Sequence, residues 1–235
     1  MLKFSRFSHL QRKMSFVYVN ERVLFMKIAV IQASSQKEKN LLLYQSVQNA
    51  VSKKDDQVVN FGIFQEEEAA YSYVQIALQI CLLLESGAVD FAVTGCSSGQ
   101  GMMLACNSLP GILCGYVQNP SDAYLFGRIN HGNVVSYPLG LNFGWAGELN
   151  LQYTMEQLFA EPFGSGYPKE EAARKQRDTK LLKEMNHISK RTLVEIFPKL
   201  SHDLIKSAVE RKLVMAYIMG YGTNEDLKTL LQGYL

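Results

Sequence analysis

Short hydrophobic runs alternate with longer amphipathic stretches through the middle of the chain. Short runs rich in β-branched residues are typical of strands, and apolar residues spaced three and four apart are typical of helices. The short runs predict strands at 27–32, 57–64, 89–94, 111–117 and 133–137. The amphipathic stretches predict helices at 37–53, 72–86, 101–108, 120–128 and 145–160. Strands that alternate with helices favour an α/β fold built on a parallel sheet with right-handed crossovers.

Two of the predicted helices have well-marked ends. Gly87 follows the helix at 72–86 and can adopt the left-handed conformation that closes a helix. Asn119 precedes Pro120, a pairing that predicts an N-cap followed by proline at the first helical position.

The two ends of the chain differ in composition from this α/β region. Residues 1–25 are basic and poor in acids, which fits either a targeting peptide or an upstream extension. Residues 169–235 are charged and helix-favouring, and the run 223–226 resembles a capping box that starts a last helix. We therefore expect an N-terminal extension over 1–25, an α/β domain over 26–168 and a helical C-terminal extension over 169–235. The C-terminal extension should pack on the sheet domain or on a neighbouring subunit.

Composition and charge exclude several classes of protein. Charged residues make up 20% of the chain and the formal net charge is +2, which is too small to indicate a nucleic-acid partner. No apolar run reaches the ~18 residues that a membrane-spanning helix needs. The four cysteines form no Cys-x-x-Cys pair, so we expect neither a zinc site nor a disulfide framework. These features predict a cytoplasmic protein that binds no metal, nucleic acid or membrane.

One glycine-rich segment carries candidate chemistry. The predicted strand at 89–94 runs directly into the loop Gly95-Cys96-Ser97-Ser98-Gly99-Gln100-Gly101, which opens the next helix. In an open parallel sheet, ligands bind beyond the carboxyl ends of the strands. A helix N-terminus there offers free backbone N–H groups to an anion, and the same field favours the thiolate form of a cysteine. Cys96 is therefore a candidate base or nucleophile.

Two other interpretations of this loop stay open at this point. Gly99 and Gly101 supply part of a dinucleotide-binding fingerprint, with Asp122 at a suitable distance for a ribose contact. However, the third small residue of that fingerprint falls at Leu104, and the motif follows the third predicted strand rather than the first. The second interpretation is a simple glycine turn beside a buried and inert Cys96.

A longer motif extends from the same loop. The run Cys96-Ser97-Ser98-Gly99-Gln100-Gly101-Met102, followed by Ala105-Cys106-Asn107-Ser108-Leu109-Pro110-Gly111-Ile112, resembles the signature of the ribose-5-phosphate isomerase B / galactose-6-phosphate isomerase family, C-G-T-G-x-G-M-x-x-A-A-N-K-x-P-G-I. The resemblance covers residues 26–178. The Gly99-Gln100-Gly101 variant and the stretch Gly166-Tyr167-Pro168 resemble a longer branch of this family with an extra C-terminal region.

The resemblance implies a fold, a reaction and several roles. The fold would be a Rossmann-like three-layer αβα sandwich with a parallel five-stranded sheet. The reaction would interconvert aldose and ketose phosphates through an enediolate, without metal or other cofactor. By position, Cys96 would remove the proton next to the substrate carbonyl, and Ser98 keeps the hydroxyl of the family's threonine. The segment from Ser97 to Gly101, with Gly99 and Gln100 inside it, would form the anion hole for the enediolate, where each fixed donor contributes about 3 kcal/mol.

The resemblance also implies an oligomer. Asn130 falls at the family's substrate-binding asparagine, which lies in a loop that reaches across a dimer contact. We therefore expect a homodimer or homotetramer that binds a small sugar phosphate in a site shared between subunits.

Several positions depart from the family pattern. The family's first loop carries an Asp-His pair that touches the substrate, whereas this loop reads Gln32-Ala33-Ser34-Ser35 and leaves Ser34 as its substrate-binding candidate. The family's ring-opening histidine falls at Ile129, and its two phosphate-binding arginines fall at Leu113 and near Gly140. The changes put the identity of the substrate in doubt more than the reaction type.

Three nearby residues are candidates for the missing roles. His131 can assist ring opening or can be a solvent-exposed loop histidine, because its position fits both. Arg128 and Arg174 are candidate phosphate ligands, since a guanidinium matches phosphate geometry, although either also fits a solvated surface position.

Three functions follow from these observations. The first is an aldose–ketose isomerase acting on a sugar phosphate, with Cys96 as its base. The second is a non-catalytic protein that binds a sugar phosphate, which the changed loops motivate. The third is a nucleotide-binding oxidoreductase, which rests on the partial glycine fingerprint alone.

Overall fold

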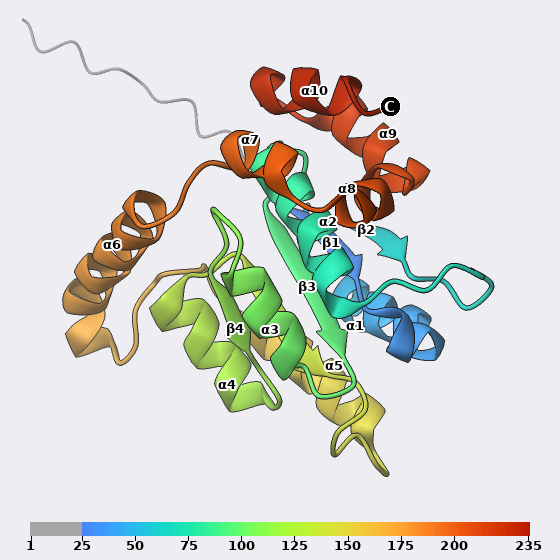
Figure 1. Ribbon diagram of the computed structural model, residues 1–235. Helices are drawn as coiled ribbons and strands as arrows, with labels where there is room; N and C mark the ends of the chain where they lie inside the picture. The colour runs from blue at the N-terminus through green and yellow to red at the C-terminus, as the bar shows by residue number, and fades with distance from the viewer. Residues whose placement is uncertain (1–24) are drawn as a thin grey trace, which may run out of the picture.

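The computed structural model describes residues 25–235 of the chain (Figure 1). The predicted N-terminal extension therefore lies outside the described residues, apart from its last residue, Phe25.

The centre of the fold is a five-stranded parallel sheet with strand order β2-β1-β3-β5-β4. Its strands are β1 (Lys27–Ile31), β2 (Gln57–Gly62), β3 (Phe91–Cys96), β4 (Cys114–Tyr116) and β5 (Val134–Pro138). All neighbouring pairs are parallel. The predicted α/β class and the five predicted strands are confirmed.

The edge strand β4 is shorter than the predicted 111–117. The Asn133 side chain bonds the backbone here, since its Nδ2 donates to the Gly111 carbonyl oxygen at 2.8 Å and its Oδ1 accepts from the Leu113 N–H at 2.9 Å. Residues 111–113 therefore meet the side chain of a loop residue where the prediction expected a strand ladder.

Helices cover both faces of the sheet (Figure 1). One face is covered by α1 (Asn40–Val51), α4 (Pro120–Leu125) and α5 (Gly147–Leu158), which share one hydrophobic cluster with the sheet. The other face is covered by α2 (Tyr73–Glu85) and α3 (Gln100–Asn107), which contribute to the second cluster. The predicted three-layer αβα sandwich is therefore confirmed.

The helix ends are formed as their residues predict. Gly87 follows α2 with φ at 70°, and the Asn119 side chain caps α4 by accepting from the Asp122 N–H at 3.0 Å. The first predicted helix divides into a 3-10 segment, η1 (Ser34–Lys39), followed by α1, because Gln36 has non-helical dihedral angles. The fourth changes at Phe126 into a short π-helical segment, η2 (Phe126–Asn130).

The C-terminal part of the described chain is helical. Its elements are η3 (Lys169–Glu171), α6 (Ala172–Ile188), α7 (Leu193–Ile196), η4 (Phe197–Lys199), α8 (His202–Val209), α9 (Lys212–Tyr221) and α10 (Glu225–Gln232). The last helix begins with Asn224 as its N-cap, which accepts from the Leu227 N–H at 3.1 Å, so the predicted capping box is a single asparagine cap. The division of the chain into domains at residue 168 stays a prediction.

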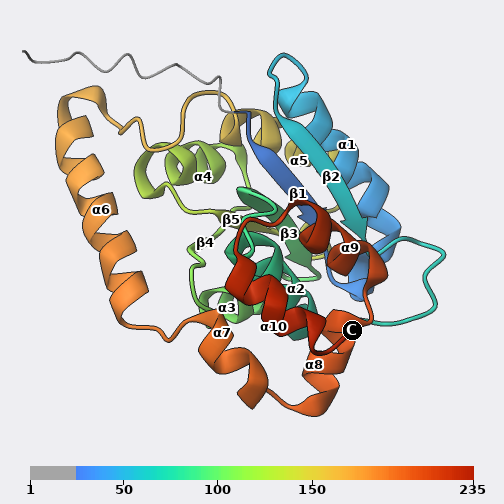
Figure 2. The same cartoon turned by 90° about the horizontal axis from the view of Figure 1, so that it is seen from above.

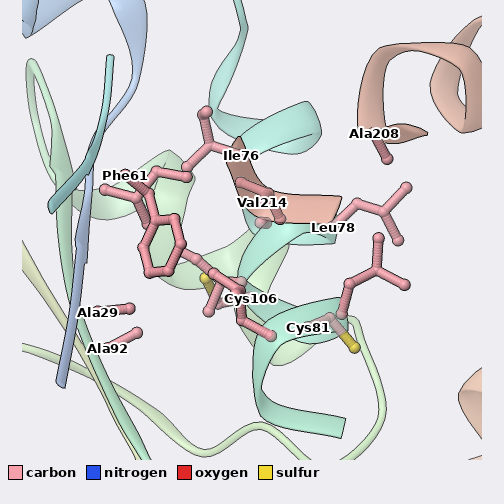
Figure 3. Close-up of a cluster of buried hydrophobic side chains, with 14 of the residues drawn as sticks. Ala29, Phe61, Ile76, Leu78, Cys81, Ala92, Cys106, Ala208 and Val214 are labelled. Carbon is pink, nitrogen blue, oxygen red and sulfur yellow. The ribbon is translucent and has the colours of Figure 1, made fainter. Parts of the chain in front are cut away.

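The helices α7 to α10 cover the outer side of α2. Figure 3 shows Ala208 of α8 and Val214 of α9 beside Ile76 and Leu78 of α2. Every residue of α2 from Ile76 to Leu83 is consequently buried. A helix that is apolar all round must be covered on all sides, and here the sheet covers one side and the C-terminal helices the other.

Helix α6 is different, because it stands beside the sheet domain in both views (Figures 1 and 2). Only Thr179 is buried in this helix, whereas the apolar side chains of Leu181, Met185 and Ile188 are 57%, 62% and 73% exposed. Thr179 ties it to η2, since its Oγ1 donates to the Ile129 carbonyl oxygen at 2.7 Å. Over residues 25–235, no helix combines the length and apolar character needed to cross a membrane.

Candidate active site

Cys96 is the last residue of β3 and lies at the carboxyl edge of the sheet, with 7% of its surface exposed. The Cys96 carbonyl oxygen accepts from the Leu139 N–H at 3.0 Å, and the Gly95 carbonyl oxygen accepts from the Ala33 N–H at 3.0 Å. The loops that follow β5 and β1 are therefore bonded to the end of β3. This is the edge at which open parallel sheets bind ligands.

The backbone after Cys96 turns sharply into α3. Gly99 is the N-cap of that helix and has φ at 73°, a left-handed conformation that favours glycine. A Cβ on Gly99 would lie 2.8 Å from Cε2 of Tyr116, so the loop packs closely against β4. The Gly99 carbonyl oxygen accepts from the Ser136 hydroxyl at 2.7 Å, which fixes the turn to β5.

The turn leaves the first N–H groups of α3 free of intrahelical acceptors, as at every helix start. Ser98 is half-buried and Ser97 and Gln100 are exposed, so this segment is open to solvent. Free helix N–H groups next to the exposed Ser97 and Gln100 can receive an anion, and the role of Ser97 to Gly101 as an anion hole stays a prediction.

The first loop contacts this segment through Ser97. The Gln36 Nε2 donates to the Ser97 Oγ at 3.1 Å, and the Ser97 hydroxyl lies 3.3 Å from the Ser35 Oγ. Lys39 donates to the Gln36 Oε1 at 3.0 Å, which places a cation one side chain away from Ser97. Ser34 faces the loop after β2, because its Oγ accepts from the Tyr71 N–H at 2.7 Å.

The sequence did not single out the tyrosines at this edge. The pKa of Tyr116 is raised by burial first, and then by electrostatic interactions with the side chains of Asp122 and Cys96, so its phenol lies near the thiol. A Cβ on Gly101 would lie 3.5 Å from the ring of Tyr73. The signal that could have found both residues is position, since Tyr116 ends a strand and Tyr73 begins a helix at the carboxyl edge.

Two other cysteines are poor candidates for a base. The pKa of the Cys81 thiol is raised by burial. The pKa of the Cys114 thiol is raised by its hydrogen bond with Cys106 and by burial. Both side chains therefore remain neutral thiols near pH 7 and pack in the core.

Asn130 and His131 lie at the opposite edge of the sheet. They immediately precede β5, and the carbonyl oxygen of Asn133 accepts from the Ala92 N–H near the start of β3. From Phe91 to Cys96, β3 spans about 16 Å at about 3.3 Å per residue. One chain therefore does not bring Asn130 or His131 to Cys96.

His131 lines a cavity of about 440 Å³ at this amino edge, together with Asp90, Phe91 and Lys183. The pKa of His131 is lowered by burial, and the positive charges of Lys183 and Arg128 lower it further. His131 is therefore held as a neutral imidazole near pH 7, a form in which one ring nitrogen can accept a proton.

The two candidate arginines are also away from the Cys96 loop. Arg128 is fully buried at the amino edge, where its Nη2 donates to the Leu158 carbonyl oxygen at 3.1 Å and its guanidinium stacks near Tyr124 and Phe163. Arg174 is on the surface of α6, where it pairs with Glu171 and Asp178 of neighbouring turns. Neither guanidinium is thus presented to a ligand at Cys96 within one chain.

No three histidine, cysteine, aspartate or glutamate side chains among residues 25–235 come together in a way that could hold a metal ion.

The ribose/galactose isomerase family model matches residues 31–165 of this chain. A solved 4-deoxy-L-threo-5-hexosulose-uronate ketol-isomerase, in complex with a tartrate, is 40% identical and superposes with a TM-score of 0.84, over 88% of this chain and 98% of that one. A ribose-5-phosphate isomerase from Vibrio parahaemolyticus is 34% identical with a TM-score of 0.85, over 90% of this chain and 100% of that one. No curated protein sequence matches this chain.

A ribose 5-phosphate isomerase from Thermotoga maritima shares the fold, at 24% identity and a TM-score of 0.50. It covers 66% of this chain and 97% of its own length. The two more similar structures cover 88% and 90% of this chain, so they share its C-terminal helices.

Proposed function

This chain belongs to the ribose/galactose isomerase family, in a divergent branch with a C-terminal extension, and on that premise we propose that it interconverts an aldose and a ketose with Cys96 as the base. The observation that carries the proposal is the position of the Cys96 thiol, at the end of a buried strand and beside the N-terminus of α3.

The chemistry would be a proton transfer between adjacent carbons. The Cys96 thiolate removes the proton from the hydroxyl-bearing carbon next to the carbonyl. The electrons of that C–H bond form a carbon–carbon double bond, and the carbonyl π electrons move onto the oxygen to give an enediolate. The free N–H groups between Ser97 and Gly101, with the Ser98 hydroxyl, stabilise this negative charge. Return of the proton to the former carbonyl carbon, with transfer of the hydroxyl proton between the two oxygens, gives the isomer and regenerates the thiolate.

The site would be completed by a second copy of the chain. Within one chain, Cys96 lies at the carboxyl edge of the sheet and Asn130 and His131 lie at the amino edge. A dimer in which each copy contributes its 128–133 loop to the other's Cys96 joins them, with Asn130 as a substrate ligand and neutral His131 assisting ring opening. The exposed apolar side chains of α6, a helix bonded to that loop through Thr179, support a contact between copies.

Two classes of anionic sugar are candidate substrates. The 34% identical relative is a ribose-5-phosphate isomerase, which supports the sugar phosphate that the sequence predicts. The 40% identical relative is a ketol-isomerase named for a hexosulose uronate, which supports a carboxylate. Among the described residues, the candidate arginines Arg128 and Arg174 both lie away from Cys96, which favours the carboxylate, because a phosphate dianion needs more charge-assisted partners than a singly charged group. Lys39, bonded to Gln36 beside Ser97, is a cation suited to one negative charge.

The test is a panel of pentose phosphates, hexose phosphates and hexosulose uronates incubated with the protein in deuterated water. NMR would detect deuterium that enters the carbon next to the carbonyl. We expect exchange and isomerisation with at least one anionic sugar, faster for a uronate than for ribose 5-phosphate. Binding without exchange by any member would instead support the non-catalytic sugar-binding function. A nicotinamide nucleotide that raises the melting temperature would support the oxidoreductase.

A further inference from the structure

Arg211 joins the C-terminal helices to the active-site edge of the sheet. It lies between α8 and α9 and is 7% exposed. Its Nη1 forms an ion pair with the Glu67 carboxylate, and its Nη2 donates to the Phe61 carbonyl oxygen. The guanidinium also lies 5.1 Å from the centre of the Tyr71 ring. One C-terminal side chain thus bonds Phe61 of β2 and contacts the middle and the far end of the loop that follows it.

That loop is in turn bonded to the first loop of the candidate active site. The Glu67 carboxylate accepts from the Phe64 N–H at 2.8 Å, which shapes the loop itself. The Glu67 carbonyl oxygen accepts from Lys37 at 3.1 Å. Tyr71 and Ser34 exchange two hydrogen bonds, from the Tyr71 N–H to the Ser34 Oγ at 2.7 Å and from the Ser34 N–H to the Tyr71 carbonyl oxygen at 3.1 Å.

The series of contacts ends at the anion hole. Ser35 and Gln36, the residues after Ser34, both bond the Ser97 hydroxyl. A continuous path therefore leads from Arg211 through Glu67 and Tyr71 to the first loop and on to Ser97. Two backbone bonds hold the first loop, from the Ala33 N–H to the Gly95 carbonyl oxygen and from the Ser34 N–H to the Tyr71 carbonyl oxygen, and the remaining links of the path are side-chain contacts.

We propose that Arg211 is a positioning residue for substrate binding, which holds the loops at 33–39 and 63–72 in the arrangement that completes the anion hole beside Cys96. This inference rests on the proposed isomerase function for its kinetic part. It assigns a role to the C-terminal extension, namely to supply one guanidinium that fixes two loops of the α/β region.

The alternative is that the Arg211–Glu67 ion pair contributes only to the free energy of unfolding and not to substrate binding. Removing one partner of a buried pair leaves an uncompensated charge and destabilises a protein strongly. A purely stabilising pair would, however, lower the melting temperature without changing the kinetics of the protein that remains folded. A positioning role predicts a change in kcat/KM well below the melting temperature, since a 1 Å misplacement of a substrate can cost about 100-fold in rate.

The experiment compares Arg211→Met, Arg211→Lys and Glu67→Gln with the full-length wild-type protein. Lys206→Met is the matched control, because Lys206 lies on α8 in an exposed pair with Glu210 at 3.7 Å. Backbone hydrogen exchange is measured by mass spectrometry for peptides covering 33–39 and 63–72, and steady-state kinetics are measured on the best substrate of the panel. Arg211→Lys and Glu67→Gln keep part of the hydrogen bonding and remain informative where Arg211→Met does not fold.

We expect faster exchange in both loops of the Arg211 variants, with the sheet core unchanged. We also expect kcat/KM to fall about tenfold or more, mainly because KM rises while kcat changes little. Arg211→Lys should recover part of the loss, and Lys206→Met should match the wild type.

Unchanged exchange at 33–39 in the folded Arg211 variants would overturn the proposal whatever the protein's substrate. Faster exchange with wild-type kcat and KM would also overturn it, because the loops would then move without consequence for binding. A wild-type protein that turns over no sugar would refute the isomerase function, while the exchange data would still decide whether Arg211 orders the loops.

Discussion

Cys96 and Asn130 lie at opposite edges of the same sheet, because Cys96 ends β3 whereas Asn130 precedes the parallel strand β5. The two residues can take part in one reaction only when the amino edge of one copy meets the carboxyl edge of another. This relationship makes the proposed shared site open to a direct test.

Mixing two inactive proteins should restore activity. Cys96→Ala removes the base and Asn130→Ala removes the substrate ligand, so each homodimer should be inactive. Hybrid dimers contain one site with both residues intact, and we expect up to about a quarter of wild-type activity after random exchange of subunits between equal amounts. Exchange is checked separately with differently tagged chains. If exchanged mixtures stay inactive, Asn130 does not contribute to the partner's Cys96 site and the proposed shared site is wrong.

Replacing the base should abolish turnover without unfolding the protein. We expect Cys96→Ala to lower kcat by at least about 100-fold, the usual effect of losing a general base, and to leave substrate binding nearly unchanged. Cys106→Ala is the comparison, because Cys106 is fully buried in the core. It should lower the free energy of unfolding by about 1 kcal/mol and retain activity. Substantial residual turnover in Cys96→Ala would remove Cys96 from the role of base.

A methyl group on Gly99 should disturb the turn into α3. Its left-handed φ costs an alanine about 1–2 kcal/mol, and the added Cβ would lie 2.8 Å from the Tyr116 ring. We expect Gly99→Ala to lower both the melting temperature and kcat. Gly220→Ala in α9 is the control, since no atom lies within 4 Å of its added Cβ and alanine favours a helix by about 1 kcal/mol. Equal behaviour of the two variants in thermal melts and kinetic assays would contradict a special role for the Gly99 turn.

Acid should destabilise the protein partly through His131. Burial lowers the pKa of His131 in the folded protein, so the unfolded chain binds a proton at a higher pH than the folded protein does. The free energy of unfolding should therefore fall as the pH drops below about 6.5, the unperturbed value for histidine. In His131→Asn this part of the pH dependence should disappear. Denaturant titrations of both proteins between pH 7.5 and pH 5 measure it, and parallel curves would show that His131 does not contribute.

The five strands and the position of the Cys96 loop could be predicted from the sequence, because the patterns that indicate them are local. The strands appear as short apolar runs, and the thiol, the glycines and the start of α3 follow one another without interruption. The pattern at 72–86 predicted a helix, but it could not tell that the C-terminal helices cover the outer side of α2.

Contacts between residues far apart in the sequence could not be predicted from local patterns. Arg211 and Glu67 are separated by 144 positions, and nothing in either local sequence marks them as partners. Arg128 shows the converse, since an arginine near a candidate loop suggested a phosphate ligand, whereas the folded chain buries its guanidinium against Leu158 and two aromatic rings. Which face a side chain takes depends on packing that only the complete fold specifies.

The double burial of α2 has a consequence for the order of events during synthesis. The ribosome completes α2 at Glu85, but its outer cover is complete only when Leu231 of α10 has been made. At a synthesis rate of about 5–20 residues per second, the C-terminal helices that cover the outer side of α2 are made on the order of 10 seconds after α2 itself. During that interval the outer side of α2 is an uncovered apolar surface, so aggregation of the nascent chain is opposed only once the C-terminal helices have been made.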